Sequence, residues 1–144
     1  MTGTDIKTTA RQFLDICVNG DDLARLGEFV ATDVEIHPAT VFGPPDTRGL
    51  TELTGALRCI RGVFPDLHVT VEDVLGDADR VALRWTARGT HESEWLGIPP
   101  TGRRVVFGGM DLYRFEQGRI CEWWRNEDFA YLTEHLTGDS HPDV

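Results

Sequence analysis

The chain has 144 residues, of which 40% are apolar and 26% are charged, and its formal net charge is −10. This length is typical of one domain, and the composition is that of an ordinary globular protein. The acidic balance disfavours nucleic acids and anionic membrane surfaces as partners, because both select for basic patches. We expect one domain over residues 1–136 and an unstructured tail over 137–144, which offers nothing to bury.

The first part of the chain predicts helices. From Ile6 to Cys17, apolar residues recur at spacings of three and four, which places them on one helical face, and Asn19-Gly20 ends this helix. A later helix with the same spacing is stopped by Pro65. The elements expected before residue 66 are a helix ending at 19–20, a short helix over 23–30, a strand over 34–36 and a helix over 50–63.

The spacing of apolar residues changes to two after residue 66, which predicts strands. Helices followed by antiparallel strands indicate an α+β fold, with the helices on one face of a curved sheet. Such a sheet leaves a cavity for a small ligand on its concave side. The elements expected here are strands over 67–71, 81–87, 104–115 and 119–126, and a closing helix over 129–136 begun by Glu127 and Asp128.

The last hairpin brings two charged residues together. With a three-residue loop at 116–118, paired positions sum to 234, so Asp111 lies opposite Trp123 and Gly109 lies opposite Arg125. Asp111 and Arg125 are then diagonal neighbours on one face of the hairpin, and Gly109 leaves room beside them.

Two interpretations of the Asp111–Arg125 pair remain open. The pair is either a structural salt bridge or a polar pair on the wall of an apolar pocket. A nearby arginine lowers the pKa of an aspartic acid, whereas burial raises it, and the sequence does not decide between them. Arg125 can also orient a carboxylate, phenolate or enolate of a substrate.

Several motifs along the chain resemble one family. They are Gly89-Thr90-His91, the segment GIPPTGR over 97–103, Asp111-x-x-Arg114 and Gly118-Arg119-Ile120-x-Glu122-x-Trp124. The run is similar to the SnoaL-like polyketide cyclases of the nuclear-transport-factor-2-like superfamily, over nearly the whole chain. The resemblance implies a cone-shaped α+β barrel, in which a curved, mostly antiparallel sheet wraps around N-terminal helices.

The resemblance also implies an activity. In these cyclases an Asp on the last strand is the general acid/base of an intramolecular aldol ring closure, and a His, a Gln and an Asn help to hold the substrate. By position, these four residues fall on Arg125, Asp111, Gly109 and His37, so none of them is kept. Asp111 is the carboxylate that could replace the missing Asp from the adjacent strand.

The remaining candidates are histidines and aromatic residues. His37 lies at the start of a Pro-rich loop over 38–45, where it is either a proton-transfer group at the rim of the pocket or a hydrogen-bonded turn residue. We therefore take Asp111, Arg125 and His37 as candidate catalytic residues. The candidate substrate-binding residues are His91, Phe107, Tyr113, Trp123 and Trp95. No set of residues has metal-ligand spacing, and no cofactor is expected.

The favoured function is a cofactor-independent enzyme of polyketide biosynthesis that closes or rearranges a ring of a small molecule. The alternatives are a hydroxylase of an aromatic polyketide and a non-catalytic ligand-binding or assembly module. Both faces of the late strands are apolar, which predicts a homodimer or higher homo-oligomer. The three widely spaced cysteines and the polar N-terminus predict reduced thiols and a cytoplasmic location.

Overall fold

The computed structural model describes residues 3–38 and 46–137. Within these ranges, no helix is long and apolar enough to cross a membrane. The helical elements are α1 (Gly3–Gln12), which continues as a π-helix over Phe13–Asn19, a 3-10 turn over Leu23–Arg25, α2 (Leu26–Phe29), α3 (Leu50–Val63) and α4 (Phe129–Thr137). The strands are β1 (Val30–Pro38), β2 (Thr47–Arg48), β3 (His68–Asp77), β4 (Arg80–Thr90), β5 (Arg104–Glu116) and β6 (Arg119–Arg125).

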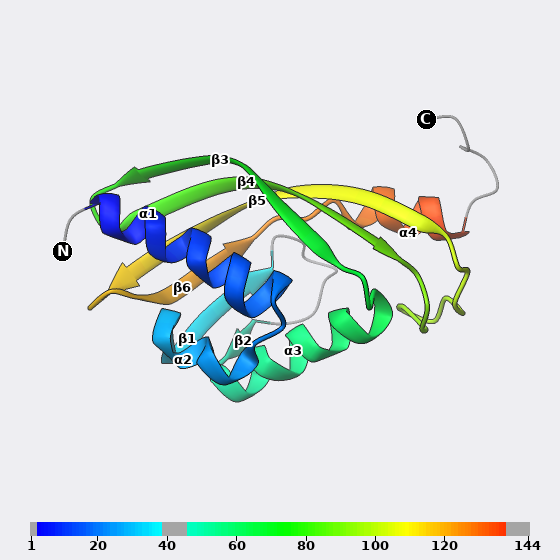
Figure 1. Ribbon diagram of the computed structural model, residues 1–144, viewed down its shortest axis with the longest axis horizontal. Coiled ribbons are helices and arrows are strands. Elements are labelled where there is room, and N and C mark those ends of the chain that lie inside the picture. Colours follow the sequence, from blue (N-terminus) through cyan, green and yellow to red (C-terminus); the bar gives the residue numbers. More distant parts are fainter. Residues whose placement is uncertain (1–2, 39–45, 138–144) are drawn as a thin grey trace.

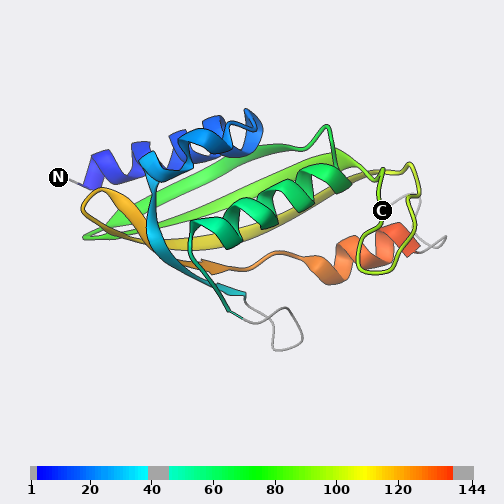
Figure 2. The ribbon, with the colours of Figure 1, turned by 90° about the horizontal axis from the view of Figure 1, so that it is seen from below.

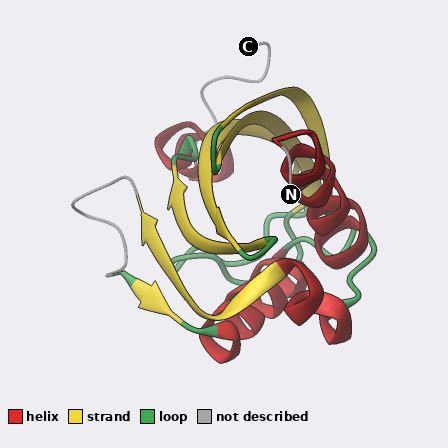
Figure 3. Ribbon diagram, turned by 90° about the vertical axis from the view of Figure 1, so that its left-hand side faces the viewer, coloured by secondary structure: helices red, strands yellow, loops and turns green. Residues whose placement is uncertain are grey.

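The strands form one six-stranded sheet in the order β2-β1-β6-β5-β4-β3. β1 and β6 pair in parallel, and the other neighbours pair antiparallel. The sheet curls strongly, and α1, α2 and α3 lie along its open side, as the end-on view shows (Figure 3). α1 crosses β3 and β4, whereas α3 runs beside β1 (Figures 1 and 2). The α+β architecture predicted from the sequence is therefore confirmed.

The core fills the space between the helices and the concave face of the sheet. The apolar stripe predicted for the first helix is buried, with Phe13 and Ala10 fully inaccessible to water. On β4 and β5, buried and exposed residues alternate, so one face of each strand packs against the helices. The concave face of β5 carries Phe107, Gly109, Asp111 and Tyr113.

Polar side chains tie the helices to the sheet. The amide of Asn19, which ends the first helix, donates to the Val69 carbonyl at 2.8 Å and accepts from the Val69 N–H at 2.7 Å. The guanidinium of Arg61 donates to the backbone carbonyls of Val18 and Leu67. The bond to Val18 satisfies a carbonyl in the last turn of the first helix, and the others fix that helix and α3 to the start of β3.

Several element boundaries agree with the sequence analysis, and others do not. The helix over 50–63 and the closing helix are present, although Thr137 still belongs to α4. The predicted tail otherwise lies outside the described residues, as does most of the Pro-rich loop. The strand over 34–36 is longer than predicted because its C-terminal part pairs with β6, and the two-residue strand β2 gave no periodic signal.

The predicted register of the last hairpin is wrong. The turn has two central residues, Gln117 and Gly118, both with positive φ (52° and 78°), as in the tight turns that suit β-hairpins. Glu116 therefore pairs with Arg119, and an irregularity around Cys121 shifts the register again, so that Tyr113 pairs with Trp123. A bulge of this kind adds one residue to one strand and cannot be read from periodicity alone.

Candidate functional site

Asp111 is a buried carboxylate on the concave face of the sheet. It is 8% exposed and pairs with Leu83 on β4. Its Oδ2 accepts a hydrogen bond from the indole N–H of Trp123 at 3.1 Å, and its Oδ1 accepts one from the backbone N–H of Asn126 at 3.3 Å. Within the described part of the chain, no cation lies within ion-pair distance of Asp111.

The surroundings of Asp111 move its pKa toward neutrality. Burial, and secondarily the negative charge of Glu127, raise the pKa of this carboxyl to about 6, and nearby N–H groups offset part of the rise. The indole N–H of Trp85 lies among those groups without forming a hydrogen bond, and the bonds to Asp111 come from Trp123 and Asn126. Both protonation states of Asp111 are therefore populated in the range where general acid–base catalysts operate.

The salt bridge between Asp111 and Arg125, one of the two interpretations that the sequence left open, is not present. With the observed register, Arg125 stands directly opposite Asp111 rather than diagonal to it. The flanking contacts fix this position: Leu112 pairs with Trp124, and the Met110 N–H donates to the Asn126 carbonyl. The guanidinium nevertheless turns to Glu127. Its Nε donates to Glu127 Oε1 at 2.8 Å, and its Nη2 donates to the same oxygen.

The space predicted beside Gly109, at the position a Cβ would take on the concave face, is also absent. A Cβ at Gly109 would lie 2.6 Å from Cζ2 of Trp85 and 2.6 Å from the Asn126 carbonyl oxygen. The glycine thus allows the Trp85 ring and the chain after β6 to approach the backbone closely, and it does not open a free volume.

An open hollow of about 490 Å³ lies beside β4, β5 and the chain after β6, and Asp111 does not line it. It is lined by Arg84, Trp85, Thr86, Gly108, Gly109, Met110, Asn126, Glu127 and Asp128. Arg84 and Met110 reach it from the exposed, convex face of the sheet, whereas the Asp111 side chain lies on the concave face. The hollow therefore does not open onto the Asp111 carboxyl.

Two of the predicted substrate-binding residues lie beside Asp111. Tyr113 and Trp123 pair across the strands with ring centroids 5.2 Å apart, and Phe13 meets both rings edge-on. Burial raises the pKa of Tyr113 well above its ordinary value, and its hydroxyl has no hydrogen-bond partner among the described residues. Phe107 lies on the same face of β5 and contacts Trp85, with ring centroids 5.9 Å apart.

His91 and Trp95 lie elsewhere, around the loop that follows β4. His91 is fully buried, and its Nδ1 accepts a hydrogen bond from the Thr101 N–H at 3.2 Å, so it ties the two ends of that loop together. Trp95 contacts Phe64 in the same region. Leu83 on β4 pairs with Asp111, and His91 follows the end of β4, eight residues farther along. Eight residues of extended strand span about 26 Å. The structure therefore does not bring these two residues to the Asp111 site.

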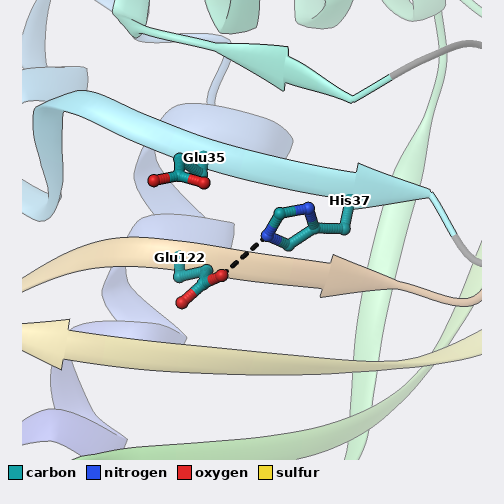
Figure 4. A group of neighbouring side chains, drawn as sticks. All are labelled: Glu35, His37 and Glu122. Carbon is teal, nitrogen blue, oxygen red and sulfur yellow. Dashed lines mark hydrogen bonds and ion pairs between the residues drawn. The ribbon is translucent and has the colours of Figure 1, made fainter.

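His37 lies on the opposite face of the sheet from Asp111. It pairs with Trp124, and its Nδ1 contacts the carboxylate of Asp46 at 2.8 Å. Its Nε2 contacts the carboxylate of Glu122 at 2.7 Å (Figure 4). Burial alone would lower the pKa of His37, but the two carboxylates together raise it above its ordinary value. His37 is thus favoured as an imidazolium in a network of charges, on the opposite face of the sheet from the other two candidate catalytic residues.

Glu35 completes a group that sequence spacing did not reveal. Side-chain ligand atoms of Glu35, His37 and Glu122 all lie within 4.8 Å of one another (Figure 4). Glu35 and His37 lie on β1 and Glu122 lies on its parallel neighbour β6, far away in the sequence. Arg48 and Arg114 already neutralise Glu35 and Glu122, respectively. The group is a charge network, and a metal ion would have to displace the ring proton of His37.

Sequence reasoning missed the roles of Glu127 and the Asn126 backbone. Glu127 was expected to begin the closing helix, and Asp128 does so, since its Oδ1 accepts from the Tyr131 N–H at 3.0 Å. Glu127 instead continues the pairing with β5, opposite Gly109. The one signal in the sequence is its spacing of two from Arg125, which puts both side chains on the same face of an extended strand.

The fold is α+β, with a curved sheet packed against helices and a buried acid, Asp111, on its concave face. Comparison with known proteins identifies the family of this chain. The family model of SnoaL-like polyketide cyclases matches residues 8–136. The chain therefore belongs to the SnoaL-like polyketide cyclase family, as the sequence motifs indicated.

Solved structures share this fold over nearly the whole chain. IdmH from Streptomyces antibioticus, a candidate polyketide cyclase, is 32% identical with a TM-score of 0.78, over 91% of this chain and 97% of its own. A SnoaL-like polyketide cyclase from Agrobacterium tumefaciens is 29% identical with a TM-score of 0.77, over 94% and 99%. AclR from Streptomyces galilaeus, a candidate hydroxylase, is 24% identical with a TM-score of 0.81, over 94% and 97%, a likeness that shows the fold alone. No curated protein matches the chain significantly.

Proposed function

We propose that this protein is a cofactor-independent enzyme that closes or rearranges a ring in a polyketide-like small molecule, with Asp111 as its general acid/base. The observation that carries the proposal is the environment of Asp111, a buried carboxyl whose pKa burial raises to about 6 and to which no cation of the described residues is bonded. The family membership supports the same function.

The proposed chemistry needs one group that both takes and returns a proton. The Asp111 carboxylate removes a proton from a carbon next to a substrate carbonyl, and the electron pair left on that carbon forms a bond to a second carbonyl carbon. The oxygen of the second carbonyl then receives the proton from the Asp111 carboxylic acid, which restores the carboxylate. The N–H groups of Trp123 and Asn126 fix the orientation of the carboxyl during both transfers.

The remaining candidates have supporting or structural roles in this proposal. Tyr113, Trp123 and Phe107 supply the aromatic surface near Asp111, and the free hydroxyl of Tyr113 can donate to a substrate carbonyl. Arg125 contributes through its ion pair with Glu127. His37, His91 and Trp95 hold the fold at other places.

The test is turnover by the Asp111→Asn variant. Acyclic and partly cyclised poly-β-carbonyl compounds are offered as substrates, and products are followed by mass spectrometry. We expect turnover to fall about a hundredfold or more, the scale of losing an acid/base group. Glu72→Gln, at an exposed carboxylate on β3, is the matched control and keeps full activity. Full activity of a folded Asp111→Asn variant would rule out the acid/base role.

The exchange of the family's catalytic Asp for Arg125 favours hydroxylation as the second candidate function. A cyclase releases a product that is isomeric with its substrate or lighter by one water, and it consumes no oxygen. A hydroxylase adds one oxygen atom and consumes oxygen when a reductant is supplied. A non-catalytic binding module turns over none of the compounds, and ligands quench its tryptophan fluorescence equally in wild type and Asp111→Asn.

The proposal includes a homodimer formed through the convex face of the sheet. Val106 and Met110 on β5 point away from the core and are 47% and 55% exposed. Apolar side chains on an uncovered sheet face favour a twofold partner as cover.

A further inference from the structure

We propose that Glu127 is a positioning residue, whose carboxylate holds the guanidinium of Arg125 away from Asp111 so that Asp111 stays free to gain and release a proton. The inference deepens the proposed function and rests on it for its catalytic meaning. It goes beyond that function because it assigns a task to a residue that touches neither the reacting proton nor the family motifs.

The register places Arg125 between two carboxylates on one face of the sheet. Asp111 stands opposite it, between the Leu112–Trp124 pair and the hydrogen bond from the Met110 N–H to the Asn126 carbonyl. Glu127 lies two residues farther along the same chain, opposite Gly109. Residues two apart on an extended strand share a face, so both carboxylates are within reach of the long Arg125 side chain.

Among the described residues, the guanidinium of Arg125 forms an ion pair with Glu127 alone. Two of its N–H groups donate to Oε1 of Glu127, and its carbon lies 5.9 Å from the ring centroid of Trp123. The Glu127 side chain is 10% exposed, so water screens this ion pair poorly. Asp111 is left with uncharged donors, the indole N–H of Trp123 and the backbone N–H of Asn126.

Few other titratable or charged groups face Asp111 and could change its charge. Tyr113 on β5 and the pair formed by Arg125 and Glu127 are the titratable or charged side chains around it in the described part of the chain. β4 presents Leu83 and Trp85, and the first helix presents the ring of Phe13, which packs on Tyr113 and Trp123. Arg125 is therefore the cation that could hold Asp111 permanently ionised, and Glu127 is the group that occupies it.

Loss of the Glu127 charge removes this restraint. In Glu127→Gln, Asp111 is the remaining carboxylate opposite Arg125, and an ion pair with an arginine lowers the pKa of an aspartic acid by about 1–3 units. Asp111 would then stay ionised and bind protons weakly. Removing Arg125 instead leaves the Glu127 charge uncompensated, which raises the pKa of Asp111 further.

The experiment is a carbon-13 NMR titration of the Asp111 carboxyl in the full-length protein without substrate. The Asp111 signal is assigned by its absence in Asp111→Asn, and amide spectra check that each variant is folded. We expect Glu127→Gln to lower the apparent pKa by about one unit or more and Arg125→Gln to raise it. In the double variant Arg125→Gln/Glu127→Gln, we expect a pKa well above that of Glu127→Gln, because only burial and neutral donors then act.

Two outcomes overturn the proposal. One is a pKa of Asp111 in Glu127→Gln within about half a unit of wild type, and the other is a double variant that titrates like Glu127→Gln, since Glu127 would then act only through its own charge. If Glu127→Gln does not fold, a fall of the pKa in Arg125→Gln counts against the proposal and a rise supports it. The titration does not depend on turnover. A failure of this inference is therefore distinguishable from a finding that Asp111 has no catalytic role.

Discussion

A carboxyl group on the core face of a strand loses most of its water, and the consequence at Asp111 depends on the absence of a compensating cation. Had Arg125 paired with it, Asp111 would be a permanently ionised structural residue. Because Arg125 bonds Glu127, burial prevails and the pKa rises to about 6. The same residue types in the same strand pair could thus give a salt bridge or an acid/base group, and one neighbouring carboxylate decides between them.

Asp111 should make the stability of the protein fall as the pH rises. In the unfolded chain an aspartic acid has a pKa of about 3.9, whereas folded Asp111 has one of about 6. Between these values the folded state holds a proton that the unfolded state has released, so folding is favoured at low pH and the contribution is lost as the pH rises through 6. Two pKa units correspond to about 3 kcal/mol.

The measurement is urea unfolding of wild type and Asp111→Asn from pH 4 to pH 7. We expect the free energy of unfolding of Asp111→Asn, relative to wild type, to increase by about 2 kcal/mol over this range. The exposed Glu72→Gln variant should follow the wild-type curve. Parallel curves for wild type and Asp111→Asn would show that the carboxyl titrates alike in the folded and unfolded chains.

At the scale of elements, the β5–β6 hairpin sets the site. A two-residue turn and an irregularity around Cys121 together place Arg125 opposite Asp111 and Glu127 opposite Gly109. The pairing continues past the end of β6, which keeps Asn126 close enough to donate its backbone N–H to Asp111. A shift of one residue would exchange the faces of all these side chains.

Substitutions of two glycines should have opposite effects on stability. Gly109→Ala places a Cβ 2.6 Å from both Trp85 and a backbone oxygen of Asn126 that accepts the Met110 N–H, so strand pairing must give way. We expect a loss of about 1–3 kcal/mol. Gly55 lies in the exposed interior of α3 with no atom within 4 Å of a built Cβ, so Gly55→Ala should gain about 1 kcal/mol. Thermal and urea unfolding check both; equal effects would contradict the close approach at Gly109.

At the scale of the whole molecule, the two faces of the sheet have different tasks. The concave face holds the core and Asp111, whereas the convex face carries the charge network of His37 and Glu122 together with exposed apolar residues of β5. The separation explains why His37 and Asp111, both chosen from the sequence as candidate catalytic residues, do not form one site.

The exposed apolar residues predict a dimer that a single charge can break. We expect the wild-type protein to sediment as a dimer at micromolar concentration and Met110→Glu to sediment as a monomer, because a carboxylate would be buried at the interface. Leu96→Glu is the control, since Leu96 is 71% exposed but lies in the loop after β4. A wild-type monomer under these conditions would rule out the proposed assembly.

The sequence by itself determined the family, the α+β fold and the faces of the late strands, because apolar periodicity and local motifs record which side of each element is buried. It also identified Asp111 as a polar residue among apolar neighbours. What the tertiary structure decided was which charges meet. The partner of Arg125, the close approach at Gly109 and the cluster of Glu35, His37 and Glu122 depend on turn length, a bulge and a parallel pairing between distant strands. These long-range geometries leave no periodic trace in the chain, because they are set by the packing of the whole sheet.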